Sequence, residues 1–454
     1  MRSVAASVIL PALLLSAYAA VAQPEVRRVS IARGEVVSEG LKPIVTSSWD
    51  DKFQVAEAGG AGCLAVAATN SWLRLVLDPA WPKDWTGPAT ISVRYFDNTG
   101  PVVMQVDSSD PRLMVNGAWS WTPPVWRGGT NAWVTSRWTI ARAGFTHRQL
   151  GADFSITGLA NRGRDTLFVA EVSVTRAGVL LSADVRGLAL GDKQAAKITA
   201  KVSGLDGKPA PDGTRLAFAS SLGECTPADA MVADGQVTTS FSPEGQPGEA
   251  IIRASCECST GEMKLPLVEG TGGVVEVDCP VEDFEAAKIG GAVDVYRSAT
   301  GEASVALVPE AAHSGLVGCA VTYAAKAGAT WFNAGVDRDF VFPGAVLGTS
   351  FWAKCTEPNV ELRWSLFDSK DEHWTYPALV QETGPDGWTK YGSETLDGYF
   401  PNRAAVLDYP LHFASVFVTR SPWSKAEKGT LFVDDISARL LVSESVAGNL
   451  GRAH

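Results

Sequence analysis

The sequence predicts an all-β fold made of tandem β-sandwiches, and three observations support this fold class. Short alternating or continuously apolar segments, such as 90–96, 197–202 and 430–433, are separated by clusters of glycine, proline, asparagine and aspartate, which is the pattern of many short strands. The 44 glycines and 25 prolines suit a turn-rich β architecture. After the first 22 residues, no segment shows the apolar periodicity of a four-turn amphipathic helix.

Residues 1–22 are predicted to be a secretory signal peptide. A basic start at Arg2 is followed by an apolar stretch over 4–15 and by Ala20 and Ala22 in an A-x-A pattern, which is the layout of a cleavable signal. The alternative, an uncleaved membrane anchor, would need about twenty apolar residues, and Pro11 interrupts a shorter run. We therefore expect an exported chain with no transmembrane segment in its mature form.

Tryptophan divides the rest of the chain into three blocks. Nine of the 15 tryptophans lie between Trp49 and Trp138, none lies between residues 139 and 330, and six lie between Trp331 and Trp423. A chain of about 430 residues suits two to four domains. The second boundary carries a Gly-Thr-Gly-Gly run, which predicts a flexible linker. The expected domains are 27–177, 178–268 and 275–442.

Charge and cysteine content limit the partners and the crosslinks. The formal net charge of −11 argues against nucleic acid and anionic membranes, which require a basic face. Seven cysteines in an exported chain permit disulfides, although the number is odd. We expect a bridge from Cys225 to Cys256 or Cys258, with Cys319 to Cys355 as a second candidate pair.

The middle block, 178–268, has the turn chemistry of a seven-stranded sandwich. Alternating or apolar segments at 196–202 and 247–254 flank the turn sequences Asp-Gly at 206–207 and Pro-Asp-Gly at 211–213. Over about ninety residues, this pattern resembles a bacterial immunoglobulin-like domain of the invasin/intimin type. The resemblance implies a bacterial protein, secreted to the periplasm or beyond, in which this domain is a spacer that presents its neighbours.

The third block, 275–442, carries four short motifs in a characteristic order. They are Asp-Phe-Glu at 283–285, His-Ser-Gly at 313–315, Gly-Trp at 387–388 and Leu-Phe-Val-Asp-Asp-Ile at 431–436. Together they resemble galactose-binding-like jelly rolls, the architecture of many carbohydrate-binding modules. The first block, 27–177, resembles such modules more faintly. Its Thr-Leu-Phe-Val at 166–169 recurs at 430–433, which indicates a weak internal repeat of two jelly rolls around the middle domain.

In the first block, three tryptophans are candidates for sugar contact. Trp119, Trp121 and Trp126 fall within eight residues among turn formers, and flat aromatic rings pack against the apolar faces of sugars. In an extended strand, Trp119 and Trp121 would share one face. The alternative is that the indoles cap the sandwich core.

The third block offers a second set of candidates. Trp374 and Tyr376 would share one face of an extended segment, while Asp371 and His373 could hydrogen-bond sugar hydroxyls. The alternative is a buried Trp374 beside solvated charges. Trp388, at a strand start, is a further binding candidate, although a core position is the stronger expectation.

A structural Ca²⁺ in the third block is implied by the jelly-roll resemblance. Such modules often hold this ion between their first and last strands, through oxygen ligands. By resemblance, Glu285 and Asp434 would be the ligands, with Asp435 as a substitute. In the first block, Ala170 stands where the third has Asp434. The alternative is that the acidic pair is a solvated strand end.

The expected function is that of a secreted, non-catalytic carbohydrate-binding protein. Two Trp-rich jelly rolls would bind a polysaccharide or cell-surface glycan, spaced by the immunoglobulin-like domain. No catalytic residue is assigned, because the sequence contains no G-x-S-x-G, P-loop or H-E-x-x-H motif. One alternative is a structural or adhesive surface protein with protein partners. Another is a carbohydrate-active lyase or hydrolase with its site on one jelly-roll face, recognisable by two carboxylates across a groove.

Overall fold

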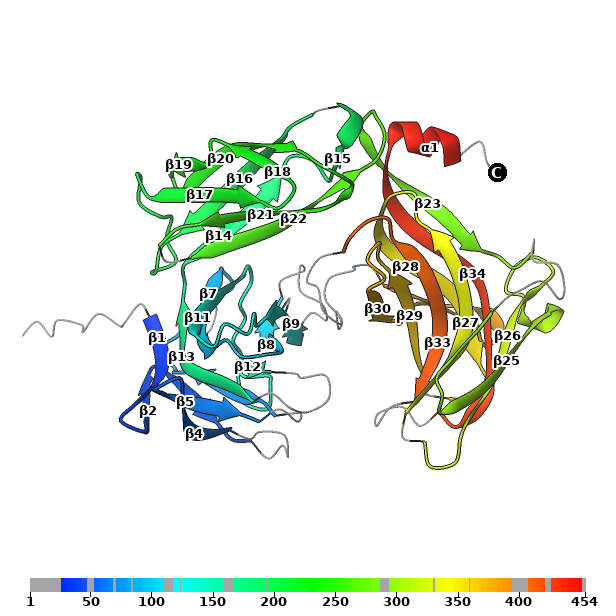
Figure 1. The fold of residues 1–454 in the computed structure, drawn as a ribbon, viewed down its shortest axis with the longest axis horizontal. Coiled ribbons are helices and arrows are strands. Elements are labelled where there is room, and N and C mark those ends of the chain that lie inside the picture. Colours follow the sequence, from blue (N-terminus) through cyan, green and yellow to red (C-terminus); the bar gives the residue numbers. More distant parts are fainter. Residues whose placement is uncertain are drawn as a thin grey trace, which may run out of the picture.

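The structure, a computed structural model, consists almost entirely of strands and confirms the all-β prediction (Figure 1). It describes residues 26–46, 53–67, 71–82, 85–109, 117–122, 124–158, 166–192, 194–257, 259–285, 294–329, 331–358, 360–393, 407–420 and 426–450. The predicted signal peptide, 1–22, lies outside these residues. Their one α-helix is α1 (Glu444–Leu450). No helix among them is long and apolar enough to cross a membrane.

The first domain is a sandwich of two sheets. One has the order β11-β7-β13-β1-β2, with β5 on β13 and β4 on β5. Its strands are β1 (Val26–Ala32), β2 (Glu35–Glu39), β4 (Phe53–Ala58), β5 (Ala61–Val66), β7 (Ala89–Phe96), β11 (Trp133–Ile140) and β13 (Leu167–Thr175). The other has the order β10-β8-β12-β6-β3, with β9 on β8. Its strands are β3 (Leu41–Ile44), β6 (Leu73–Leu77), β8 (Pro101–Ser108), β9 (Gly117–Trp121), β10 (Val125–Trp126) and β12 (Phe154–Thr157).

The middle domain is a smaller sandwich around residues such as Ile198, Phe241 and Ile252. One sheet, β14-β16-β20-β18, contains β14 (Gly178–Ala183), β16 (Ala196–Ser203), β18 (Gly223–Thr226) and β20 (Gln236–Pro243). The other, β15-β22-β21-β17-β19, contains β15 (Leu188–Ala189), β17 (Arg215–Ser220), β19 (Asp229–Met231), β21 (Gly248–Ser255) and β22 (Thr260–Val268). A 3₁₀ turn, η1 (Leu190–Asp192), is its one helical element among the described residues.

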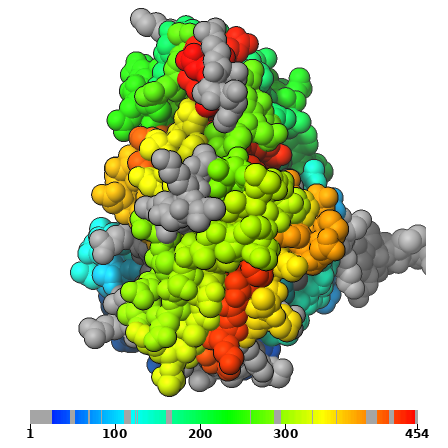
Figure 2. All heavy atoms as spheres, turned by 90° about the vertical axis from the view of Figure 1, so that its right-hand side faces the viewer, coloured from blue at the N-terminus to red at the C-terminus, as the bar shows by residue number. Residues whose placement is uncertain are grey.

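The third domain is again a sandwich of two sheets. The first, β25-β26-β34-β28-β32-β31 with β23 on β34, contains β23 (Val274–Glu282), β25 (Gly301–Val308), β26 (Gly318–Ala325), β28 (Ala345–Cys355), β31 (Leu379–Thr383), β32 (Thr389–Ser393) and β34 (Lys428–Ser443). The second, β24-β27-β33-β29-β30, contains β24 (Asp294–Arg297), β27 (Phe332–Val341), β29 (Glu361–Phe367), β30 (His373–Pro377) and β33 (His412–Arg420). Two 3₁₀ turns, η2 (Pro309–Ala311) and η3 (Pro385–Gly387), lie in its loops. Figure 2 views this domain from the side away from the first domain.

The two outer domains share one strand topology, as the weak internal repeat suggested. In each, the last strand pairs with the first strand and with one further strand along one edge: β13 with β1 and β5, and β34 with β23 and β26. On its other edge it pairs with β7 or β28. The second sheets also correspond, because β3-β6-β12-β8-β9 matches β24-β27-β33-β29-β30 in chain order. The recurring Thr-Leu-Phe-Val therefore lies at or near the start of the same central strand in both domains.

The glycine run at 270–273, predicted to be a flexible linker, is held by hydrogen bonds instead. The amide of Gly272 donates to Asp192 Oδ2 at 2.6 Å, and the amide of Thr271 donates to Ser445 Oγ at 2.9 Å. Gly191 N donates to Gly270 O at 2.9 Å. Glycine is present here because the chain passes close to its neighbours, and not because it must move.

No disulfide joins the described cysteines to one another, so the expected Cys319–Cys355 bridge is wrong and Cys225 does not pair with Cys256; Cys258 lies outside the described residues. Cys319 pairs with Val433 and Cys355 with Leu431, on opposite edges of β34. Two strand spacings of about 4.8 Å each separate them, which exceeds the reach of a disulfide. Burial raises the pKa of both thiols to about 12.

Candidate functional site

Each outer domain has one sheet whose outward face carries aromatic and polar side chains. In the first domain, β9 places Trp119 and Trp121 on this face, because its register sets Trp121 opposite Gln105 of β8. Ser120 points inward between them and is fully buried. The prediction that Trp119 and Trp121 share a face is therefore confirmed by the strand geometry.

The two indoles contact one side chain just before β6 and one within it. The Trp121 ring packs edge-on against Trp72, with ring centres 5.6 Å apart. The Arg74 guanidinium lies over the Trp119 ring at 5.5 Å from its centre, which is a cation–π contact. Both Trp119 and Trp121 are half-buried, so the expectation of exposure is met in part. The side chain of Trp126, in β10, lies outside the described residues.

A row of polar side chains crosses the sheet beneath these rings. The strand register aligns Arg74, Ser155, Gln105 and Trp121 across four strands. Arg74 Nη1 donates to Ser155 Oγ at 3.3 Å, and Ser155 Oγ donates to Gln149 Oε1 at 2.6 Å. We call Trp72, Arg74, Gln105, Trp119, Trp121 and Ser155 the first-domain face. Trp119, Trp121 and Gln105 are half-buried, whereas Trp72, Arg74 and Ser155 are buried, so this face presents mainly the two rings to a ligand.

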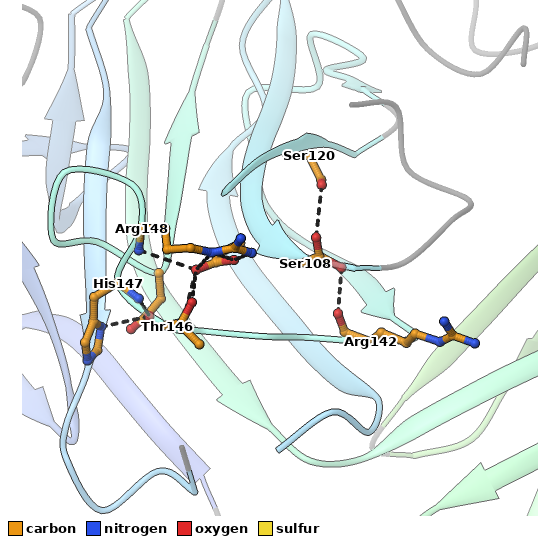
Figure 3. Close-up of polar contacts among 8 residues, drawn as sticks. Ser108, Ser120, Arg142, Thr146, His147 and Arg148 are labelled. Carbon is orange, nitrogen blue, oxygen red and sulfur yellow. Dashed lines mark hydrogen bonds and ion pairs between the residues drawn. The ribbon is translucent and has the colours of Figure 1, made fainter. Parts of the chain in front are cut away.

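The loop that supplies Gln149 is fixed by the end of β8 (Figure 3). Asp107, fully buried, accepts hydrogen bonds from Arg148 Nε at 3.0 Å and from Thr146 Oγ1 at 2.8 Å. The next residue, Ser108, donates through Oγ to Arg142 O at 2.7 Å, and Ser120 of β9 donates to Ser108 O at 3.4 Å. Burial raises the pKa of Asp107, but the bonds from Arg148 and Thr146 outweigh it and hold that pKa below its usual value.

This loop also stores backbone strain. Phe145, His147 and Leu150 adopt left-handed φ angles of 45°, 60° and 55°, which are unfavourable for residues with a Cβ. A second buried carboxylate, Asp153, accepts from His147 N at 3.0 Å and pairs with its Nδ1 at 2.9 Å (Figure 3). Burial raises the pKa of Asp153. The two acids therefore hold the loop in the strained path that brings Gln149 over the sheet.

The platform expected from Trp374 and Tyr376 in the third domain is wrong. Both side chains point into the core: Trp374 is 4% exposed and Tyr376 1% exposed. Tyr376 stacks on Trp364 at 4.6 Å, and Trp374 Nε1 donates to the buried Asp368 at 3.3 Å. Trp388, also a binding candidate, is buried as well, which agrees with the stronger expectation for that residue. The alternation was recognised correctly, but it was assigned to the opposite face of the sheet.

The outward face of β30 instead carries His373, whose ring stacks on Phe367 of β29 at 4.7 Å. Burial lowers the pKa of His373. Phe367 is 38% exposed and was missed by the sequence analysis. Its signal was present, since Leu362, Trp364 and Leu366 alternate inward along β29 and leave Phe367 on the other face.

Phe367 and Asp371 line a pocket of about 400 Å³ on this sheet. The Asp371 prediction thus falls at a cavity, and Asp371 turns into position with a left-handed φ of 58°. We call this cavity the third-domain pocket. Its lining residues are Asp294, Asp337, Arg338, Asp339, Phe367, Asp368, Asp371, His412, Phe413 and Ala414.

The pocket is acidic, because five of its lining residues are aspartates and its one arginine pairs with a carboxylate outside the lining. Arg338 pairs with Glu282 at 2.5 Å, and His412 Nδ1 pairs with Asp339 at 3.1 Å. Asp294 and Asp337 face each other across β24 and β27. Burial, and then the charge of Asp294, raise the pKa of Asp337. The pocket therefore presents mainly hydrogen-bond acceptors around an aromatic ring.

The expected calcium ligands hold a loop. Glu285 Oε1 accepts from Leu316 N at 2.6 Å and Val317 N at 2.9 Å. Asp434 Oδ2 accepts from the amide of His313 at 2.7 Å, while Asp435 pairs with the His313 ring. Among the described residues, no group of three or more His, Cys, Asp or Glu side chains could hold a metal ion. Glu285 and Asp434 therefore act here as acceptors for loop amides, and calcium binding by them stays a prediction.

No family model and no curated protein matches the sequence. Solved structures that resemble it include carbohydrate-binding modules and intimin/invasin adhesin domains, the two classes named by the sequence resemblance. A family 11 carbohydrate-binding module from Clostridium thermocellum, in complex with a β-1,3-1,4-mixed-linked tetrasaccharide, is 19% identical, covers 37% of this chain and 95% of its own, and gives a TM-score of 0.26.

An intimin C-terminal fragment, in complex with the intimin-binding domain of the translocated intimin receptor, is 12% identical, covers 43% of this chain and 61% of its own, and gives a TM-score of 0.18. The Yersinia pseudotuberculosis adhesin InvE is 11% identical, covers 59% of this chain and 58% of its own, and gives a TM-score of 0.18. The fold of this chain is defined by its own sheets. Alignments this distant say nothing about its ligand.

Proposed function

We propose that this chain is an exported carbohydrate-binding protein and that the third-domain pocket is its principal sugar site. The observation that carries the proposal is a cavity of about 400 Å³ with the half-exposed ring of Phe367 among carboxylates. Ligand pockets of 300–1,000 Å³ are usual for small molecules. A sugar ring presents apolar faces to an aromatic side chain and hydroxyls to acceptors around it, which is the arrangement found here.

The charge of the pocket narrows the class of sugar. Asp294, Asp337 and Asp371 accept hydrogen bonds from hydroxyls, whereas they would repel a carboxylate or sulfate on the ligand. A neutral polysaccharide is therefore favoured over a polyanionic one. The first-domain face offers a second, weaker contact through Trp119 and Trp121, which are half-buried.

The proposal is tested by binding to a panel of neutral and acidic polysaccharides, including mixed-linkage β-1,3-1,4-glucan. We expect Phe367→Ala to abolish retention on the polysaccharide that binds the wild type, because it removes the ring at the centre of the pocket. Leu379→Ala is the control, since Leu379 is 57% exposed on the other sheet. Undiminished binding by Phe367→Ala, or preferential binding of acidic polysaccharides, would show that the site is elsewhere.

A second candidate function is glycoside hydrolysis at the same pocket. Asp337 has a raised pKa and lies in a cavity that Asp368 and Asp371 line as well. An acid with a raised pKa beside an ionised carboxylate is the pair that hydrolysis requires. The test is release of reducing ends from the bound polysaccharide. If release occurs, Asp337→Asn should abolish it while retaining binding; if none occurs, the site is for binding alone.

A further inference from the structure

The first and middle domains meet without a free linker. Only residues 176–177 separate β13 from β14. Thr90 Oγ1, on β7, lies 2.8 Å from Ser259 Oγ, and Thr139 Oγ1, on β11, donates to Thr260 O at 2.6 Å. Thr90 and Ser259 are buried. A junction of buried hydrogen bonds is fixed more firmly than a surface contact.

An aromatic wedge reinforces this junction. Trp85 donates through Nε1 to Pro88 O at 3.1 Å, and the Arg176 guanidinium lies 5.7 Å from the centre of its ring. The ring rests against the Asp-Gly turn of the middle domain: a Cβ added to Gly207 would lie 2.3 Å from Trp85 Cη2. Only glycine permits this approach, at a φ of +80° that other residues also avoid.

The junction between the middle and third domains is equally close. Ala189 and Val268, from the middle domain, belong to the hydrophobic core of the third. Arg186 pairs with Glu276 of β23 at 2.7 Å. A Cβ added to Gly270 would lie 2.1 Å from Ser443 Oγ. Together with the hydrogen bonds of residues 270–273, these contacts hold the third domain directly against the middle domain, without a flexible segment between the two.

In Figure 1 the outer domains descend from opposite ends of the middle domain, and β8 and β9 of the first lie on the side toward β29 and β30 of the third. These are corresponding strands of the repeated topology. We infer that the middle domain fixes the first-domain face and the third-domain pocket in one arrangement, so that both engage a single polysaccharide chain. This inference rests on the proposed function.

The fixed arrangement determines how strongly a long ligand binds. A polymer held at one site is presented to the second at an effective concentration that rigid spacing raises, whereas a short oligosaccharide reaches one site only. Preorganisation also removes the entropy cost of aligning the two domains. The polymer should therefore bind on the order of 100-fold tighter than an oligosaccharide.

Matched glycine variants isolate the junctions. Gly207→Ala is compared with Gly213→Ala, whose φ of +83° carries the same strain but whose Cβ would touch nothing within 4 Å. Gly270→Ala, at φ +99°, is compared with Gly245→Ala, at φ +96° and equally unobstructed. The controls reproduce the backbone cost, so any difference within a pair arises at the junction.

Two measurements on the full chain test the inference. Small-angle X-ray scattering should fit the arrangement of Figure 1 for the wild type and both controls, and should deviate for Gly207→Ala and Gly270→Ala. With mixed-linkage β-1,3-1,4-glucan and its tetrasaccharide as probes, the junction variants should lose at least about 10-fold in polymer affinity and nothing in tetrasaccharide affinity.

Three other outcomes would overturn the inference. Scattering of the wild type that requires an ensemble of domain arrangements removes the fixed geometry. Equal affinity for polymer and tetrasaccharide removes the joint binding but leaves the proposed function standing. If neither the glucan nor its tetrasaccharide binds, the proposed function is wrong for this glucan and so is the joint site, even if the scattering shows a fixed arrangement.

Discussion

Replacing Trp374 separates the core position seen in the structure from the exposed platform that the sequence suggested. Its indole is 4% exposed and donates to Asp368 at 3.3 Å. Removing a buried tryptophan costs about 3–5 kcal/mol, and here it also leaves Asp368 with one hydrogen bond fewer. For a domain of this size, 1 kcal/mol corresponds to roughly 2–4 °C, so Trp374→Ala should lower the midpoint of the third-domain transition by about 6–20 °C.

The control is the same substitution at an exposed tryptophan of the same domain. Trp331 is 40% exposed and contacts Arg363 at 5.6 Å from its ring centre, so Trp331→Ala should cost about 1–2 kcal/mol. Differential scanning calorimetry suits the assay, because a three-domain chain unfolds in more than one transition. If Trp374→Ala lowers the midpoint no further than Trp331→Ala, then Trp374 is not part of the core and the assignment of faces in β30 is wrong.

Three further predictions concern charge. Asp107→Asn should destabilise the first domain by about 2–3 kcal/mol in calorimetry. This loss is smaller than that from breaking a fully buried ion pair, because water can solvate the half-exposed Arg148 once its partner is removed. Burial raises the pKa of Asp434 to about 6, so ionisation costs more in the folded state; the stability of wild type relative to Asp434→Asn should fall as pH rises from about 4 to 6 and stay level above. EDTA should leave the unfolding midpoint unchanged, because Glu285 and Asp434 already accept backbone amides; a lowered midpoint would support the calcium prediction instead.

The fold class could be predicted from the sequence, because strand periodicity and turn residues depend only on residues close together in the chain. The orientation of a strand is different. In β9 the tryptophans face outward and Ser120 inward, whereas in β30 Trp374 and Tyr376 face inward and His373 outward. Period-two alternation states which residues share a face, but the choice of face depends on the register with the neighbouring strand.

The third-domain pocket could be predicted only in part for a related reason. Asp371 stood beside an aromatic strand in the sequence, but Asp294 and Asp337 come from strands far from it along the chain and meet it through the sheet order. The glycine run at 270–273 shows the same limit. Its composition suggested mobility, while its hydrogen bonds to Asp192 and Ser445 depend on segments 80 and 174 residues away.

The pairing of first and last strands makes each outer domain a closed unit whose two ends coincide. Val26 lies opposite Thr175 in one domain, and Val274 lies opposite Ser443 in the other. Domains with adjacent ends tolerate excision, insertion and circular permutation. Joining the ends of the first domain, whose core cluster is formed by its own residues, and opening it at a surface turn should therefore yield a permuted sandwich, whereas the third domain cut out alone would lose Ala189 and Val268 from its core.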